Sequence, residues 1–179
     1  MSRLLPSNLA DHRGPLRPLA LGLNALDTLA GWAIIVMLGV MVAVVSLQVL
    51  LRYALNSSFG FADEMSRLSF VWSIFLGIPL GIRLGSHIGM ELLSSRLPPR
   101  VQDVLARAMA VLAGAMMVLV AWQSAVVAFD QWDELMASMN GSAAWFIVAV
   151  GVGCGHSALH LLWIVLTGKP VMTETVATE

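Results

Sequence analysis

The sequence predicts an all-α membrane protein with four transmembrane helices, which together form a membrane domain over residues 28–168. Of the 179 residues, 58% are hydrophobic and only 12% are charged, and the mean hydropathy is +0.82. Such a composition is typical of integral membrane proteins. Crossing a hydrocarbon core of about 30 Å takes about 20 mainly apolar residues. Four stretches of that kind are present.

The first transmembrane helix is expected at residues 28–51, which carry no charge. Residues 1–27 are expected to form a cytoplasmic tail and a short interfacial segment. The Leu- and Ala-rich run at residues 19–26 is too short to cross a bilayer, and Asp27 closes it.

The second transmembrane helix is expected at residues 61–83. Its uncharged core is too short to cross alone, so the helix must extend through Asp63 and Glu64 at one end and to Arg83 at the other. Acidic residues in a first turn and an arginine in a last turn both complement the helix dipole.

Residues 84–107 are expected to form an amphipathic cytoplasmic connection between the second and third helices. Within it, Pro99 suits the first position of a helix. The third and fourth spans are expected at residues 108–129 and 143–166, and residues 169–179 form a second cytoplasmic tail.

The distribution of Lys and Arg predicts the orientation. With both termini in the cytoplasm, eight of the ten basic residues lie inside, as the positive-inside rule requires. The formal net charge of −1 argues against a nucleic-acid partner, and the expected surroundings of the spans are membrane lipid.

Ionisable residues gather where the first two spans meet the outer surface. Gln48 and Arg52 are four residues apart on one helix, and Asp63 and Arg67 are four apart on the next, with Glu64 alongside. Arg52 is expected to pair with Asp63 or Glu64. Three interpretations remain open: a clamp on the hairpin, a docking surface for another protein, or a direct role in transport.

Small residues form stripes along the spans, including Gly77 and Gly81 in the second and Gly151 and Gly155 in the fourth. Such stripes let helices approach closely in lipid. By contrast, no Asp, Glu, Lys or Arg lies in the middle of any predicted span. Since a charge at that depth is kept for function, we do not expect this chain to be a pump or carrier by itself.

Three histidines raise the alternative of a membrane anchor for a b-haem redox complex. His156 and His160 share one face of the fourth helix, and His87 follows the second. Paired haem ligands would come from different helices, so polar packing is the favoured role. Motifs for catalysis or metal binding are absent from the sequence, and we expect neither an enzyme nor a cofactor in this chain.

Several motifs together resemble one family. They are Gln48, Arg52-Tyr53, residues 61–67 (FADEMSR), residues 70–72 (FVW), residues 75–77 (FLG) and residues 87–89 (HIG). The chain resembles the small membrane subunit, DctQ type, of tripartite ATP-independent periplasmic (TRAP) transporters. Phe61 stands where the family pattern has Trp, and Asp63 where it has the first Glu; both changes preserve the character of the side chain.

The resemblance implies a division of labour in the bacterial inner membrane. A periplasmic substrate-binding protein delivers an organic acid, and a large DctM-type subunit holds the substrate and sodium sites. The small subunit packs against the scaffold of the large one, with Arg52, Asp63, Glu64 and Arg67 stabilising it or its outer contacts. The acidic loop with Asp130, Asp133 and Glu134 is expected to face the periplasm and to help receive the binding protein.

Overall fold

The computed structural model describes residues 17–56, 60–83 and 99–167, and the described part is helical apart from short connections. The four helices are α1 (Arg17–Ala54), α2 (Ala62–Arg83), α4 (Pro99–Asp130) and α5 (Ala144–Thr167). Each is long and apolar enough to cross a membrane. The predicted all-α class with four membrane helices is therefore confirmed.

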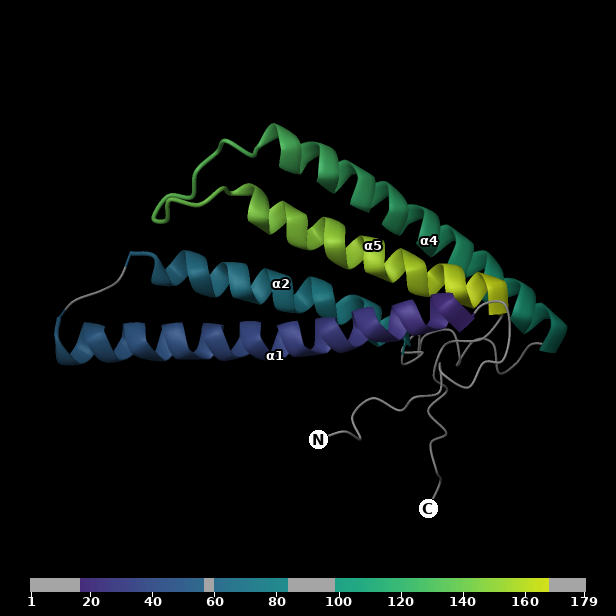
Figure 1. Cartoon of the computed structure of the whole chain (residues 1–179), viewed down its shortest axis with the longest axis horizontal. Coiled ribbons are helices and arrows are strands. Elements are labelled where there is room, and N and C mark those ends of the chain that lie inside the picture. The colour runs from purple at the N-terminus through teal and green to yellow at the C-terminus, as the bar shows by residue number, and fades with distance from the viewer. Residues whose placement is uncertain (1–16, 57–59, 84–98, 168–179) are drawn as a thin grey trace, which may run out of the picture.

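The helices lie side by side in the order α1, α2, α5, α4 (Figure 1). Each of these neighbouring pairs is in extensive contact, whereas α1 touches α5 only briefly. The helices converge where α1 begins and α5 ends, and they spread apart toward the opposite side of the molecule. We call these two ends the terminal end, which holds residues 17–27, 83 and 167, and the loop end, which holds residues 54–56, 60–62 and 131–143.

The first helix is longer than the sequence predicts. It begins at Arg17 and runs unbroken through residues 19–26, the expected interfacial segment, and through Asp27. Pro18 does not prevent this, because proline is tolerated in the first turn of a helix. At 1.5 Å per residue, the helix is about 57 Å long, well beyond the hydrocarbon core of about 30 Å.

The other helices begin and end close to the predicted positions. Pro99 is the first residue of α4 as expected, and α2 has Asp63 and Glu64 in its first turn and Arg83 in its last. The rest of the predicted amphipathic connection, including His87, lies outside the described residues, as do residues 1–16 and 168–179.

Tight packing is concentrated around α5. Two clusters of buried apolar side chains involve this helix, one built on Trp163 with Leu23 and Ala20 of α1, the other on Leu161 with Ile82 of α2 and Ala110 of α4. In contrast, the most apolar 18-residue window of α1 has no residue buried inside the protein. This window of α1 is therefore accessible to lipid or to another chain.

Small residues set the closest approach, and of the two glycines involved the sequence singles out Gly151 but not Gly153. A Cβ placed on Gly153 of α5 would overlap the backbone carbonyl of Phe75 in α2, so only glycine fits there. Gly151 lies close to Ser124 of α4. A Cβ on Gly77, Gly81 or Gly155 would have no atom within 4 Å.

Candidate functional site

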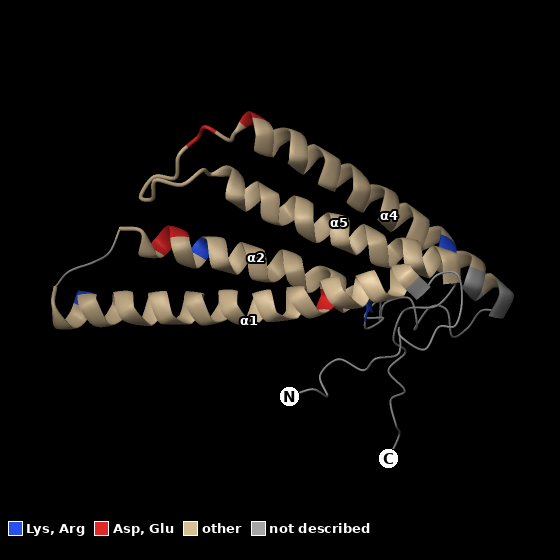
Figure 2. Ribbon diagram, viewed as in Figure 1, with Lys and Arg blue, Asp and Glu red and all other residues tan. Residues whose placement is uncertain are grey.

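Charged residues lie at the two ends of the helices, and the central parts of α2, α4 and α5 are free of them among the described residues (Figure 2). Two clusters of polar side chains stand out. One is exposed at the loop end, where the sequence predicts it. The other is buried at the terminal end, and the sequence does not reveal it.

At the loop end, α1 and α2 are joined through Gln48 rather than through Arg52. The Gln48 side-chain amide donates to the Asp63 carboxylate at 3.3 Å. Arg52 and Arg67 are exposed, and within residues 17–56, 60–83 and 99–167 neither forms an ion pair. The structure does not show the possible pair of Arg52 with Asp63 or Glu64, and the contact between α1 and α2 that it does show here is made by Gln48.

Glu64 instead holds the loop between α4 and α5. Its carboxylate accepts a hydrogen bond of 3.0 Å from the backbone N–H of Ser138. The loop is closed on itself, since the N–H of Met136 donates to the carbonyl of Gly141 and that of Ala143 to the carbonyl of Glu134. The start of α2 thus fixes the position of a loop that lies more than 70 residues away in sequence.

The three acidic residues expected near this loop are all exposed. Asp130 ends α4, and Asp133 and Glu134 follow in the connection. Beneath them, the indole of Trp145 lies 6.0 Å from that of Trp132 and 6.5 Å from that of Trp72 on α2. Trp132 thus joins the loop to the aromatic rings of α5 and α2, and the three carboxylates are exposed.

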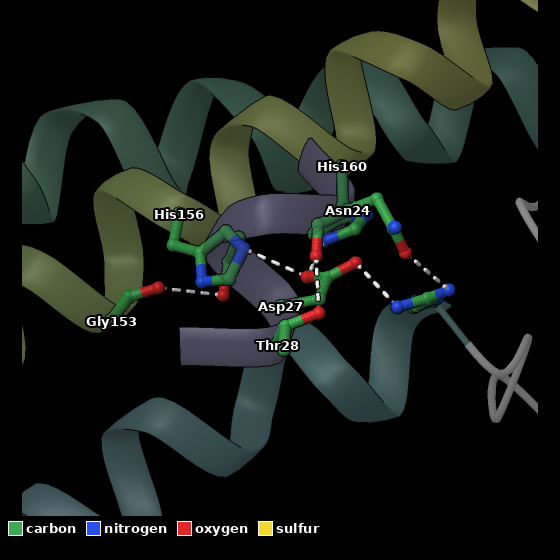
Figure 3. A network of polar contacts seen from close by, with 8 residues as sticks. Asn24, Asp27, Thr28, Gly153, His156 and His160 are labelled. Atoms are coloured by element: carbon green, nitrogen blue, oxygen red, sulfur yellow. Dashed lines mark hydrogen bonds and ion pairs between the residues drawn. The ribbon is translucent and has the colours of Figure 1, made fainter. Parts of the chain in front are cut away.

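The buried cluster joins three helices around Asp27 (Figure 3). One carboxylate oxygen, Oδ2, accepts a hydrogen bond of 2.8 Å from Arg83 at the end of α2. The other, Oδ1, lies 2.9 Å from Nε2 of His156 and 2.8 Å from Nε2 of His160, both on α5. Asn24 accepts a further bond of 3.3 Å from Arg83.

Burial makes this cluster unusual. The exposed fraction is 0% for Asp27, 3% for Arg83, 7% for His156 and 1% for His160. A buried ion must be paired and hydrogen-bonded to be tolerated. Here the carboxylate has a partner on each oxygen, and its charge is balanced by one guanidinium. The arrangement ties the beginning of α1 to the ends of α2 and α5.

The sequence offers only a weak signal for this cluster. From the sequence, Asp27 is interpreted as the end of an interfacial segment and Arg83 as an arginine at the end of a helix. His156 and His160 are interpreted as polar packing residues. The spacing of the two histidines places them on one helical face, which is visible in the sequence. That this face meets Asp27 depends on how α1 crosses α5.

Comparison with known proteins agrees with the fold. The family model described as "Tripartite ATP-independent periplasmic transporters, DctQ component" matches residues 41–168. A protein of Haemophilus influenzae named "Putative TRAP transporter small permease protein" is 38% identical over 68 residues, which make up 38% of this chain and 42% of that protein. The match to this relative therefore spans less than half of its length.

The family match covers more than half of the chain and includes three of the four membrane helices in full or nearly so. Four apolar helices are consistent with a multi-pass membrane protein. The chain belongs to the DctQ family, the small permease subunits of TRAP transporters.

Proposed function

We propose that this chain is the scaffold subunit of a TRAP transporter that imports an organic acid together with sodium. The single observation that supports a scaffold role is the state of its buried charges. Among the described residues, the buried ionised side chains are Asp27 and Arg83, and they neutralise each other. No buried charge is left unpaired within these residues to hold a carboxylate substrate or to serve as a sodium site.

The substrate and sodium sites are then expected in the large membrane subunit. In this assignment the small subunit needs no catalytic step and contributes stability and position. The exposed apolar surface of α1, which extends over most of the helix, provides ample area for contact with another membrane chain. The haem alternative finds no support, because His156 and His160 belong to the same helix.

A reconstitution experiment tests the scaffold role. The large subunit is purified with and without this chain, and its thermal stability and sodium-driven uptake are compared in liposomes supplied with the loaded binding protein. We expect stability and uptake to require the small subunit. A large subunit that is equally stable and active alone would contradict the proposal.

We further propose that both termini lie in the cytoplasm of a bacterial cell, with the chain in its inner membrane. Arg17 and Thr167, the first and last described residues, lie at the same end of the molecule (Figure 1). The excess of Lys and Arg on that side supports the orientation. Labelling of single cysteines at the loop end by an impermeant reagent in whole cells is the test, and failure to label there would contradict it.

The acidic loop is proposed to help dock the binding protein. Asp130, Asp133 and Glu134 are exposed at the loop end, and hydrogen bonds from Ser138 to Glu64 hold that loop in place. Complementary surface charges increase association rates in a salt-dependent way. Reversal of all three charges to lysine should slow docking, most strongly at low salt. The matched control replaces them by Asn, Asn and Gln, which should give an intermediate effect.

If the charge-reversed protein bound the loaded binding protein with unchanged affinity and supported unchanged uptake, the docking role would be excluded. The scaffold role would stand, because the three side chains take no part in helix packing.

A further inference from the structure

Three potential metal ligands converge in the buried cluster. One imidazole nitrogen each of His156 and His160 and a carboxylate oxygen of Asp27 all lie within 4.8 Å of one another, and all three residues are buried. We propose that these residues form a binding site for a divalent transition-metal ion, with Zn²⁺ as the best fit. The proposal replaces the expectation from sequence that this chain holds no metal, and it does not depend on the transport role.

The geometry is close to that of a zinc site. Zinc binds imidazole nitrogen at about 2.0–2.1 Å and carboxylate oxygen at about 2.0–2.2 Å, so two ligand atoms of a tetrahedral ion lie about 3.3 Å apart. The Oδ1 atom of Asp27 is 2.9 Å and 2.8 Å from the two imidazole nitrogens. An outward movement of about 0.5 Å would admit the ion.

The placement of the histidines also suits a metal. His156 and His160 are four residues apart on α5, so both rings leave the same face of the helix, and their centroids are 5.1 Å apart. Paired histidines with this spacing on one helix are a recurring zinc-binding arrangement. Asp27 approaches from α1, and the ion would therefore link two helices that have little other contact.

Arg83 is compatible with the ion because it uses the other carboxylate oxygen. It binds Oδ2 of Asp27, which leaves Oδ1 directed at the histidines. Outer hydrogen bonds of this kind commonly orient ligating carboxylates. The charges of Asp27 and Arg83 cancel. A Zn²⁺ ion together with these residues and the two neutral histidines would therefore have a net charge of +2, as does a zinc ion bound by three neutral histidines, a ligand set that zinc enzymes use.

The tautomer of the histidines distinguishes a metal site from a purely hydrogen-bonded cluster. Without a metal, each ring must carry its proton on Nε2 to donate to Asp27. With a metal, Nε2 is deprotonated and the proton lies on Nδ1. Nδ1 of His160 has no partner among the described residues, so no second hydrogen bond favours either tautomer of that ring.

The test uses the full-length chain, purified in detergent with metal-free buffers and then equilibrated with Zn²⁺ or Co²⁺ alone. We expect about one equivalent of zinc per chain by mass spectrometry and a visible absorption band for the cobalt form, since cobalt reports its coordination. Nitrogen-15 NMR of labelled histidine should show both rings protonated on Nδ1 in the zinc form. None of these measurements depends on transport.

Two ligand variants and one matched control complete the design. His156→Gln and His160→Gln should each lose the bound zinc while keeping the helical circular dichroism signal. Asn24→Ala, which removes only a contact of Arg83, should retain it. If zinc binding survived both histidine substitutions, the site would lie elsewhere and the proposal would be overturned.

Zinc stoichiometry and histidine NMR of the wild-type chain test the metal site even where a variant fails to fold. Substoichiometric zinc at micromolar free metal, or both rings protonated on Nε2 in the presence of zinc, would show a hydrogen-bonded cluster only and would also overturn the proposal.

Discussion

Arg83 donates a 2.8 Å hydrogen bond to Asp27 across 56 residues of sequence, and both side chains are almost completely buried. This ion pair joins the last turn of α2 to the third turn of α1. It explains how an acidic residue is accommodated inside a continuous and mainly apolar helix.

Removing one member of the pair should be far more harmful than removing both. Asp27→Asn leaves the Arg83 charge uncompensated, and Arg83→Gln does the same to Asp27. Breaking a buried pair in this way is destabilising by about 3–5 kcal/mol, whereas a neutral replacement of both partners is often tolerated. Unfolding of the single variants and of the double variant in metal-free detergent solution measures the difference. Equal destabilisation of all three would contradict a paired role.

Gly153 should not accept even a methyl group. In Gly153→Ala the added Cβ meets the backbone carbonyl of Phe75, which cannot move aside as a flexible side chain could. Overpacking of this kind is destabilising by about 1–3 kcal/mol. Gly155→Ala on the same helix is the matched control, because its Cβ has nothing within 4 Å. Thermal unfolding of the two variants should differ clearly, and similar midpoints would show that α2 and α5 are not in this close contact.

Replacing the neutral Gln48 should loosen the contact between α1 and α2 more than replacing the charged Arg52. Gln48→Ala removes the hydrogen bond to Asp63 that joins α1 to α2 at the loop end. Arg52→Ala removes an exposed side chain that forms no ion pair with the described residues. Cross-linking between cysteines introduced near residues 48 and 63 should become less efficient only in the first case. A larger effect of Arg52→Ala would instead support an ion pair of Arg52 that clamps the two helices.

Glu64 should control the mobility of the loop between α4 and α5. Glu64→Ala removes the acceptor for the Ser138 amide, and hydrogen exchange at that amide should become faster. Glu64→Gln keeps one acceptor oxygen and should have a smaller effect. Exchange measured by mass spectrometry on peptides covering residues 131–143 reports both. Unchanged protection in Glu64→Ala would mean that the loop is held by its aromatic contacts instead.

The loop-end residues show how far a motif can be interpreted before a structure is known. Asp63 and Glu64 do lie in the first turn of α2, as the helix dipole argument predicts. The hydrogen-bond partners of these two residues cannot be predicted in the same way. They depend on the length and direction of the Gln48 side chain and on the path of residues 131–143, and the spacing of residues along the chain gives neither of these.

The amino-acid sequence by itself determined that this is a four-helix membrane protein of the DctQ family, because apolar runs of bilayer length and a set of local motifs are visible without any contact being known. Only the tertiary structure decided that Asp27 lies inside a helix, opposite Arg83, His156 and His160, and that Gly153 is the point of closest approach. The physical reason is that a span is specified by the residues within it, whereas a buried ion pair or a close helix contact depends on how two distant helices cross. The energy that holds Asp27 in place comes from side chains 56 or more residues away, and no local pattern contains it.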